Sequence, residues 1–213
     1  YYWYKYNLYN VCNAAFASIG LSLDLNKFQK LNKKLLFDSP LPCDFPYKRS
    51  SFVLKAGAGS GEIIQTSIGQ GRTLVTPYHL ALVMSSIVND GVLMKPYIID
   101  KVTNYNGAEV SAVLPEEYET LLSKKKAAAL RQYLRAVVTQ GTASALNSQN
   151  YEAAGKTGSA EFTSAKDSHA WFAGYASKKG MEDLVISVVV EGAGTGGAYA
   201  VPVAKAAFDA YFR

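Results

Sequence analysis

The segment AAGKTGSAEF sets a lysine and two hydroxyl side chains close together on what the pattern predicts to be a strand. Lys156 can supply positive charge, and the hydroxyls of Thr157 and Ser159 can donate hydrogen bonds. Gly155 and Gly158 weaken the strand, because glycine has no side chain to pack and loses more backbone entropy on ordering. We therefore expect another backbone or a ligand to approach closely here.

The two histidines do not add a hydrolytic triad to this segment. His79 lies in a predicted helix, and His169 begins the apolar run HAWF that follows the lysine segment. Neither is close to a Gly-x-Ser-x-Gly elbow, so packing or surface roles are the favoured interpretation for both. The glycines of EGAGTGG follow a strand but do not match the dinucleotide-binding pattern, so a cofactor is not expected.

Composition and charge exclude several classes of protein. The 213 residues are 49% hydrophobic and 18% charged, as in an ordinary globular domain. The net charge is +5, but the lysines are scattered, so nucleic acid is not expected as a partner. The longest apolar run is too short to span a bilayer. The spacing of Cys12 and Cys43 gives little support to a metal or redox pair; idle thiols are favoured, and a disulfide stays open.

Helical patterns dominate the first half of the chain. Apolar positions recur at helical spacing within residues 12–37, with Asn26 as a plausible cap, and a proline-rich irregular connection follows. A clearer helix begins at Thr76, which caps it, with Pro77 at the first helical position, and it stops at Gly91.

The second half predicts a sheet. A helical region is expected over 115–140, the pair Asn106-Gly107 predicts a hairpin turn, and AVPVAKAAFDAYF predicts a closing helix. Strands are expected at 96–103, 152–162, 168–176 and 183–191. The last three have short connections and should form an antiparallel meander, and DLVISVVVE, apolar on both faces, should be central and covered by helices. The fold class is therefore α+β, with helices covering an antiparallel sheet.

Several longer segments carry a resemblance to a known family. They are CNAAFASIGL, EIIQTSIGQGRTLVTPYHLALVMSSIVNDGVLMKPY, GKTGSAEF, HAWFAGYA and EGAGTGGAYAVPVAKAAF, which together reach from about Asn13 to Phe212. The chain resembles the C-terminal part of the transpeptidase domain of a class B penicillin-binding protein. That superfamily, shared with the serine β-lactamases, uses Ser-x-x-Lys, Ser-x-Asn and Lys-Thr-Gly elements. The resemblance implies a β-lactamase/transpeptidase-like fold.

The resemblance implies a role for each residue of the lysine segment. A D,D-transpeptidase holds the terminal carboxylate of a D-alanyl-D-alanine peptide, aligns the peptide like an added strand and stabilises an oxyanion. Lys156 would supply charge from a groove, Gly158 would admit the substrate backbone, and the Ser159 N–H would form half of the oxyanion hole. The substrate-binding residues are then expected to be Lys156, Thr157, Gly158, Ser159 and Ala160.

The Ser-x-Asn element is only partly matched. Asn13 stands in VCN, where its amide would contact the peptide group of the substrate, unless it is a simple helix cap. Val11 replaces the serine of the element, which in the family is thought to help pass protons to the leaving group. A valine cannot do so. This departure favours a rival interpretation, a non-catalytic penicillin-binding or scaffold domain; a β-lactamase is weaker, because nothing resembles a dedicated deacylation base.

Two other motif matches are interpreted as coincidences. Ser123 to Lys126 fits Ser-x-x-Lys, but it follows the asparagine element, whereas in the family the nucleophile precedes it, and it opens a lysine-rich helix. Ser148 to Asn150 fits Ser-x-Asn, but it lies in a polar turn before the lysine segment.

The nucleophile itself is not found. Residues 1–12 contain no serine, and the chain does not begin with methionine, so we expect residues 1–213 to be one partial transpeptidase domain without its N-terminal portion. The resemblance implies a parent enzyme that takes the peptidoglycan stem peptide and β-lactam antibiotics, uses no metal or cofactor and lies at the outer face of a bacterial cytoplasmic membrane. The chain alone is expected to be inactive.

Overall fold

The computed structural model describes residues 2–148, 150–162 and 167–213. In chain order the helices are α1 (Tyr2–Tyr9), α2 (Asn13–Ser22), α3 (Leu25–Lys34), α4 (Ser60–Ser67), α5 (Pro77–Val88), α6 (Lys124–Gln140) and α7 (Val201–Tyr211), with short helical turns η1 (Ser144–Leu146) and η2 (Gly196–Ala200). The strands are β1 (Val92–Met94), β2 (Lys101–Thr103), β3 (Glu109–Ala112), β4 (Glu117–Thr120), β5 (Glu152–Ala160), β6 (His169–Ser177) and β7 (Leu184–Val190).

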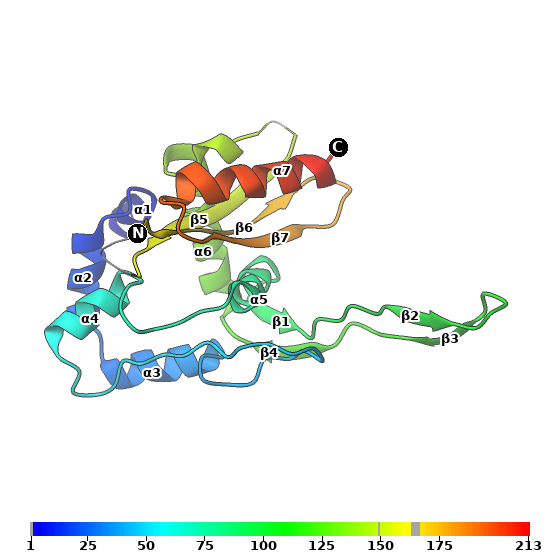
Figure 1. Cartoon of the computed structure of the whole chain (residues 1–213), viewed down its shortest axis with the longest axis horizontal. Coiled ribbons are helices and arrows are strands. Elements are labelled where there is room, and N and C mark those ends of the chain that lie inside the picture. Colours follow the sequence, from blue (N-terminus) through cyan, green and yellow to red (C-terminus); the bar gives the residue numbers. More distant parts are fainter. Residues whose placement is uncertain (1, 149, 163–166) are drawn as a thin grey trace.

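The main sheet is an antiparallel meander in the order β5-β6-β7, as predicted. Figure 1 shows α7 along one face of this sheet and α5 on the other. The prediction that the last strand is central is wrong for the described residues, because each short connection places a strand beside its predecessor and so puts β6 in the middle. The apolar character of β7 has another cause: Ile186 packs in the cluster on the α7 side and Val185 in the cluster on the α5 side.

Two apolar clusters cover the two faces of the sheet. The cluster on the α7 side includes the fully buried Phe172 of β6 and Phe208 of α7, and the cluster on the α5 side includes Met84 and Tyr175. Because α6 contributes residues to both clusters, it fixes the position of β5 relative to both layers of helices. The predicted α+β class, an antiparallel sheet covered by helices, is confirmed.

The predicted start of α5 is correct, and the predicted cap of α3 is not. The Thr76 side chain accepts a hydrogen bond from the backbone of His79 and caps α5 as expected. Gly91 has φ +95°, and a Cβ there would lie 2.1 Å from the Leu122 carbonyl oxygen, so only glycine fits after the helix. The prediction of Asn26 as a cap is wrong, because Asp24 accepts hydrogen bonds from two backbone N–H groups at the start of α3.

Two strand and helix predictions were also wrong. Residues 117–120 form β4 rather than the start of a helix, because they pair with β1. Of the strand expected over 96–103, only β2 forms; before it, Asp100 still accepts a backbone hydrogen bond from Val113. The Asn106-Gly107 turn is confirmed between β2 and β3, which form an arm extending from the rest of the molecule (Figure 1). Both cysteines are free.

His79 is a buried link between α5 and the segment after α3. Its Nε2 lies 2.6 Å from the Leu35 carbonyl oxygen, which can only accept, so Nε2 carries the proton. Nδ1 is buried with no hydrogen-bond partner among the described residues. Burial lowers the pKa of His79, so the ring is neutral in the folded protein.

This burial predicts a pH effect on stability. The unfolded chain binds a proton near pH 6.5 and the folded chain does not, so the free energy of unfolding falls as the pH drops below about 6.5. One such group contributes a slope of at most about 1.4 kcal/mol per pH unit. Denaturant unfolding between pH 7.5 and 5 should show this slope in the wild type. A His79→Gln variant should have lost it; equal slopes would contradict the assignment.

Candidate active site at the outer edge of β5

The lysine segment forms the second half of β5, where β5 pairs with β6 over its whole length. Gly155 lies opposite Gly174, and the Phe172 ring packs over both: a Cβ at Gly155 would lie 2.4 Å from Phe172 Cζ. The same Cβ would lie 2.7 Å from the Ala173 carbonyl oxygen, so the close approach expected at Gly155 is that of the β6 backbone together with a core aromatic ring. At Gly158, Trp171 Cβ, at 3.3 Å, is the only atom of the described residues within 4 Å of a Cβ, so these residues leave the space above this glycine open.

The difference between the two glycines can be tested by the same substitution. Gly155→Ala should lower the free energy of unfolding by about 1–3 kcal/mol, because the added methyl group overpacks the core against Phe172. Gly158→Ala should cost less than about 1 kcal/mol, since only one contact must shift. Denaturant unfolding of both variants provides the comparison, and equal losses would show that the ring is not what requires Gly155.

Lys156 is half-buried on the opposite face of the strand from Thr157, with its ammonium folded back over the strand edge. Its Nζ donates to the Thr157 carbonyl oxygen at 2.7 Å, and it forms no ion pair with any residue that the structure describes. Desolvation lowers the pKa of Lys156 to about 8. A partly desolvated cation without a carboxylate partner is suited to binding an anionic group.

Thr157 is buried, and its hydroxyl lies 2.5 Å from the Thr142 hydroxyl. Either oxygen can be the donor, so the second hydroxyl proton of the pair stays available for another acceptor. Thr142 follows the end of α6, which packs against β5. The hydroxyl of Thr157 is thus positioned by Thr142, just after α6, a contact that the sequence pattern did not indicate.

Ser159 is exposed, and both its backbone and its side chain form hydrogen bonds with other residues. Its hydroxyl accepts a hydrogen bond from the Gly196 N–H at 3.4 Å, and its carbonyl oxygen accepts one from Gln70 Nε2 at 3.0 Å. The carbonyl therefore points away from β6, and in an antiparallel ladder the N–H of the same residue points the same way. The Ser159 N–H faces outward, as an oxyanion donor would. Ala160, half-buried, pairs with His169.

Asn13 belongs to a different element from the lysine segment. It is the first residue of α2, is exposed, and follows Cys12 at the capping position, so it is not the helix cap. No hydrogen bond joins it to the described residues of β5. The connection between the two parts runs through packing, since α2 packs on α4 and Gln70, just after α4, reaches β5. Val11 is exposed with φ +54°, an unusual conformation for a β-branched residue.

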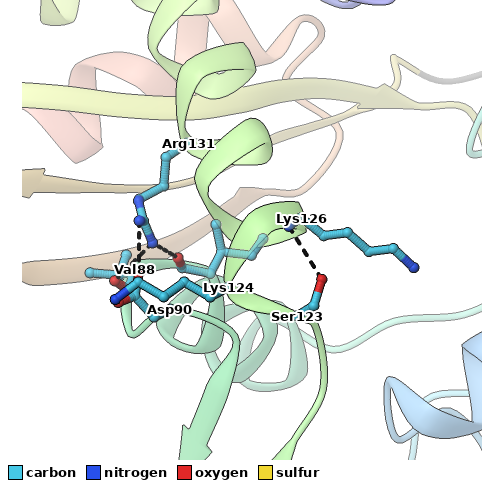
Figure 2. A network of polar contacts seen from close by, with 7 residues as sticks. Val88, Asp90, Ser123, Lys124, Lys126 and Arg131 are labelled. Atoms are coloured by element: carbon cyan, nitrogen blue, oxygen red, sulfur yellow. Dashed lines mark hydrogen bonds and ion pairs between the residues drawn. The ribbon is translucent and has the colours of Figure 1, made fainter.

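The Ser-x-x-Lys match at the start of α6 is a helix cap. The Ser123 hydroxyl accepts a hydrogen bond from the backbone N–H of Lys126, and the Lys126 side chain extends away from it (Figure 2). Next to it, Asp90 forms ion pairs with Lys124 and Arg131, which join the end of α5 to α6. At the second match, the Ser148 hydroxyl accepts from the Asn150 N–H, as in a turn, while Gln149 lies outside the described residues.

Three residues of the site were given no role in it from the sequence: Gln70, Thr142 and Gly196. Gln70 stands in the IGQG motif and Gly196 in EGAGTGG, so both motifs were noted without a role for these positions. A Cβ at Gly196 would lie 2.3 Å from the Trp171 carbonyl oxygen and 2.5 Å from that of Gly158. This glycine therefore lets η2 lie directly on the backbone of β5 and β6.

Comparison with known proteins identifies the fold and the family. The chain is 30% identical over 212 residues to the peptidoglycan D,D-transpeptidase PbpA of Mycolicibacterium smegmatis, covering 95% of this chain and 42% of that protein. It aligns with a TM-score of 0.77 to the D,D-transpeptidase domain of a peptidoglycan glycosyltransferase from Eggerthella lenta, at 26% identity, covering 95% of this chain and 52% of that one. These domains have the β-lactamase-like fold.

A further solved structure is penicillin-binding protein A of M. tuberculosis as a ceftriaxone acyl-enzyme complex, with a TM-score of 0.81, 25% identity, and coverage of 93% of this chain and 46% of that one. Residues 4–209 match the family described as the penicillin binding protein transpeptidase domain. The chain belongs to this family, and its relatives include class B penicillin-binding proteins. It spans about two fifths of the length of the M. smegmatis relative.

Neither a metal cluster nor a membrane span is found in the part of the chain that the structure describes. No group of three or more His, Cys, Asp or Glu side chains in residues 2–148, 150–162 and 167–213 is placed to hold a metal ion. Within the same ranges, no helix has both the length and the apolar character needed to cross a membrane.

Proposed function

We propose that the protein to which this chain belongs is a serine D,D-transpeptidase that cross-links peptidoglycan and is acylated by β-lactams. The observation that carries the proposal is the outer edge of β5, where the Lys156 ammonium and the outward-facing N–H of Ser159 lie on one strand in a family of acyl-transfer enzymes. The acyl-enzyme complex of a relative supports β-lactam binding, and the name of another relative supports the peptidoglycan substrate.

The chemistry assigns a role to each part of the edge. A serine hydroxyl attacks the carbonyl between the two terminal D-alanines; the C–N bond breaks, and D-alanine leaves with a proton. The Lys156 charge and the free hydroxyl proton of the Thr157–Thr142 pair bind the terminal carboxylate. The Ser159 N–H stabilises the oxyanion, Gly158 and Ala160 border the substrate backbone, and Asn13 binds its peptide group.

The nucleophile is proposed to lie outside residues 1–213, in the same protein. Residues 1–12 contain no serine, and Ser123 is occupied as a helix cap. The family further suggests an anchor that holds the protein at the outer face of a bacterial cytoplasmic membrane. The stem peptide and β-lactams are the proposed ligands; neither a cofactor nor nucleic acid is invoked.

D-Alanine release tests the proposal directly. The intact protein, incubated with a stem pentapeptide and an acceptor amine, should release D-alanine and form the cross-linked product, and penicillin pretreatment should block both. A protein that binds penicillin but releases no D-alanine would favour the rival function, a non-catalytic scaffold. This alternative is specific to the chain because Val11 stands where the family has a serine.

Val11 provides a prediction that separates the two functions. In the intact enzyme, Val11→Ser should raise the rate of acylation by penicillin about tenfold, because a hydroxyl at this position restores a proton relay, and such groups typically contribute 10²-fold or more. Val11→Ala is the matched control, since it removes the branched side chain without adding a hydroxyl. Equal rates for the serine and alanine variants would show that no relay operates through residue 11.

A further inference from the structure

Gln70 makes the contact that a neighbouring strand would make with β5. Its side-chain Nε2 donates to the Ser159 carbonyl oxygen at 3.0 Å, and its Oε1 accepts from the Glu161 N–H at 3.2 Å. One amide thus satisfies a carbonyl and an N–H two residues apart on the same edge. This is the pair of backbone groups through which an added strand hydrogen-bonds to the outer edge of an antiparallel sheet.

The loop that carries Gln70 is built to present this side chain. Gly69 and Gly71 on either side have φ +78° and +85°, a region that side-chain-bearing residues rarely adopt. The Gln70 N–H donates to the Gln65 carbonyl oxygen at 2.8 Å, which fixes the loop to the end of α4. The backbone of the loop is therefore anchored, while the long Gln70 side chain can rotate away from β5 without moving α4.

Two other carbonyl oxygens of the outer edge also have hydrogen-bond partners in this structure. The Ala153 carbonyl oxygen accepts from the Arg135 guanidinium at 2.8 Å, and the Thr157 carbonyl oxygen accepts from Lys156 Nζ. A peptide that adds to β5 beside the Ser159 N–H therefore needs the Ser159 carbonyl oxygen as its acceptor. In this structure that acceptor is bonded to Gln70.

We propose that Gln70 is a gate on the substrate edge of β5: its amide occupies the Ser159 and Glu161 backbone groups in the unliganded protein, and the acyl donor must displace it. This inference rests on the proposed function, since it assumes a peptide or a β-lactam amide that pairs with β5. Gln70 is a specificity-determining residue under this proposal, because a ligand that cannot replace both hydrogen bonds does not open the edge. Breaking the two Gln70 hydrogen bonds costs free energy, and this cost mainly weakens non-covalent binding, the step before acylation.

The test compares Gln70→Met with Gln65→Met in the intact protein. Methionine has nearly the length of glutamine but forms neither hydrogen bond, and Gln65 is exposed, lies on the same helix–loop unit and makes no side-chain hydrogen bond to the described residues. Loss of two exposed hydrogen bonds predicts a second-order rate of acylation by penicillin about threefold to tenfold higher for Gln70→Met. The increase should come from tighter non-covalent binding, with the maximal acylation rate unchanged. Gln65→Met should match the wild type.

A second measurement does not depend on the reaction. Hydrogen exchange of the Glu161 amide should be faster in Gln70→Met than in the wild type and unchanged in Gln65→Met, because the Glu161 N–H donates to the Gln70 side chain and not to that of Gln65. An equal or lower acylation rate in Gln70→Met, an increase confined to the maximal rate, or unchanged Glu161 exchange would overturn the gate. A wild-type protein that penicillin does not acylate would instead refute the proposed function, and the gate with it.

Discussion

Replacing Lys156 with methionine is expected to slow acylation of the intact protein by penicillin about 100-fold or more, the usual cost of removing an electrostatic group from an acyl-transfer site. The ammonium lies at the outer edge of β5 and has no carboxylate partner among the described residues, so it is available for the carboxylate of the ligand. Lys178→Met is a matched control, because Lys178 Nζ also donates to a backbone carbonyl, that of Phe212, away from the site.

The same substitution should not harm the fold. Burial lowers the pKa of Lys156 to about 8, so the charged form is less stable in the folded chain than in water. The folded chain loses this proton before the unfolded chain does, so the stability of the wild type should rise with pH between about 8 and 10.4. The Lys156→Met variant should have a higher melting temperature than the wild type at pH 7. Its stability should not increase between about pH 8 and 10.4 as that of the wild type does. Acylation within a factor of about three of the wild type would exclude Lys156 from the site.

Removing the Ser159 N–H should have an effect of similar size. Proline at this position lacks the donor, and an edge strand tolerates proline where the N–H faces outward. Ser159→Pro in the intact protein is expected to slow acylation about 100-fold to 1000-fold, the cost of losing one oxyanion-hole donor.

Ser159→Ala is the control for Ser159→Pro. It keeps the N–H and loses only the hydroxyl that accepts from Gly196. Stopped-flow acylation and thermal melting of both variants separate the chemical effect from a folding effect. If the proline variant melts like the alanine variant and is acylated as fast, the N–H of Ser159 is not an oxyanion donor.

The sequence predicted the parts of the fold that depend on local pattern. The meander β5-β6-β7 follows from three apolar strands with short connections, and α5 follows from Thr76 and Pro77 at its start. The start of the region 115–140 was mistaken for helix, because residues 117–120 form a strand only through pairing with β1, a tertiary contact. The strand β7 was placed at the centre because a strand buried on both faces has the same apolar pattern at an edge covered by helices.

The site was predictable to a similar extent. The run from Lys156 to Ala160 is one strand, so its residues could be named together from the sequence. Gln70 and Gly196 reach Ser159 from 89 and 37 residues away, and these contacts depend on how α4 and η2 pack. Another backbone or a ligand was expected to approach Gly155. The Ala173 carbonyl oxygen of β6 does so, but the Phe172 ring that also lies there could not be predicted, because the sequence does not say which residues pair with this strand.

The most direct test of the proposed acyl transfer is the site of the penicillin adduct. The intact protein and the isolated chain of residues 1–213 are each incubated with a fluorescent penicillin, and intact mass and peptide mapping follow. A one-to-one adduct is predicted on a serine of the intact protein outside residues 1–213, with none on the isolated chain. The absence of any adduct on the intact protein, or an adduct on Ser123 in either sample, would contradict it.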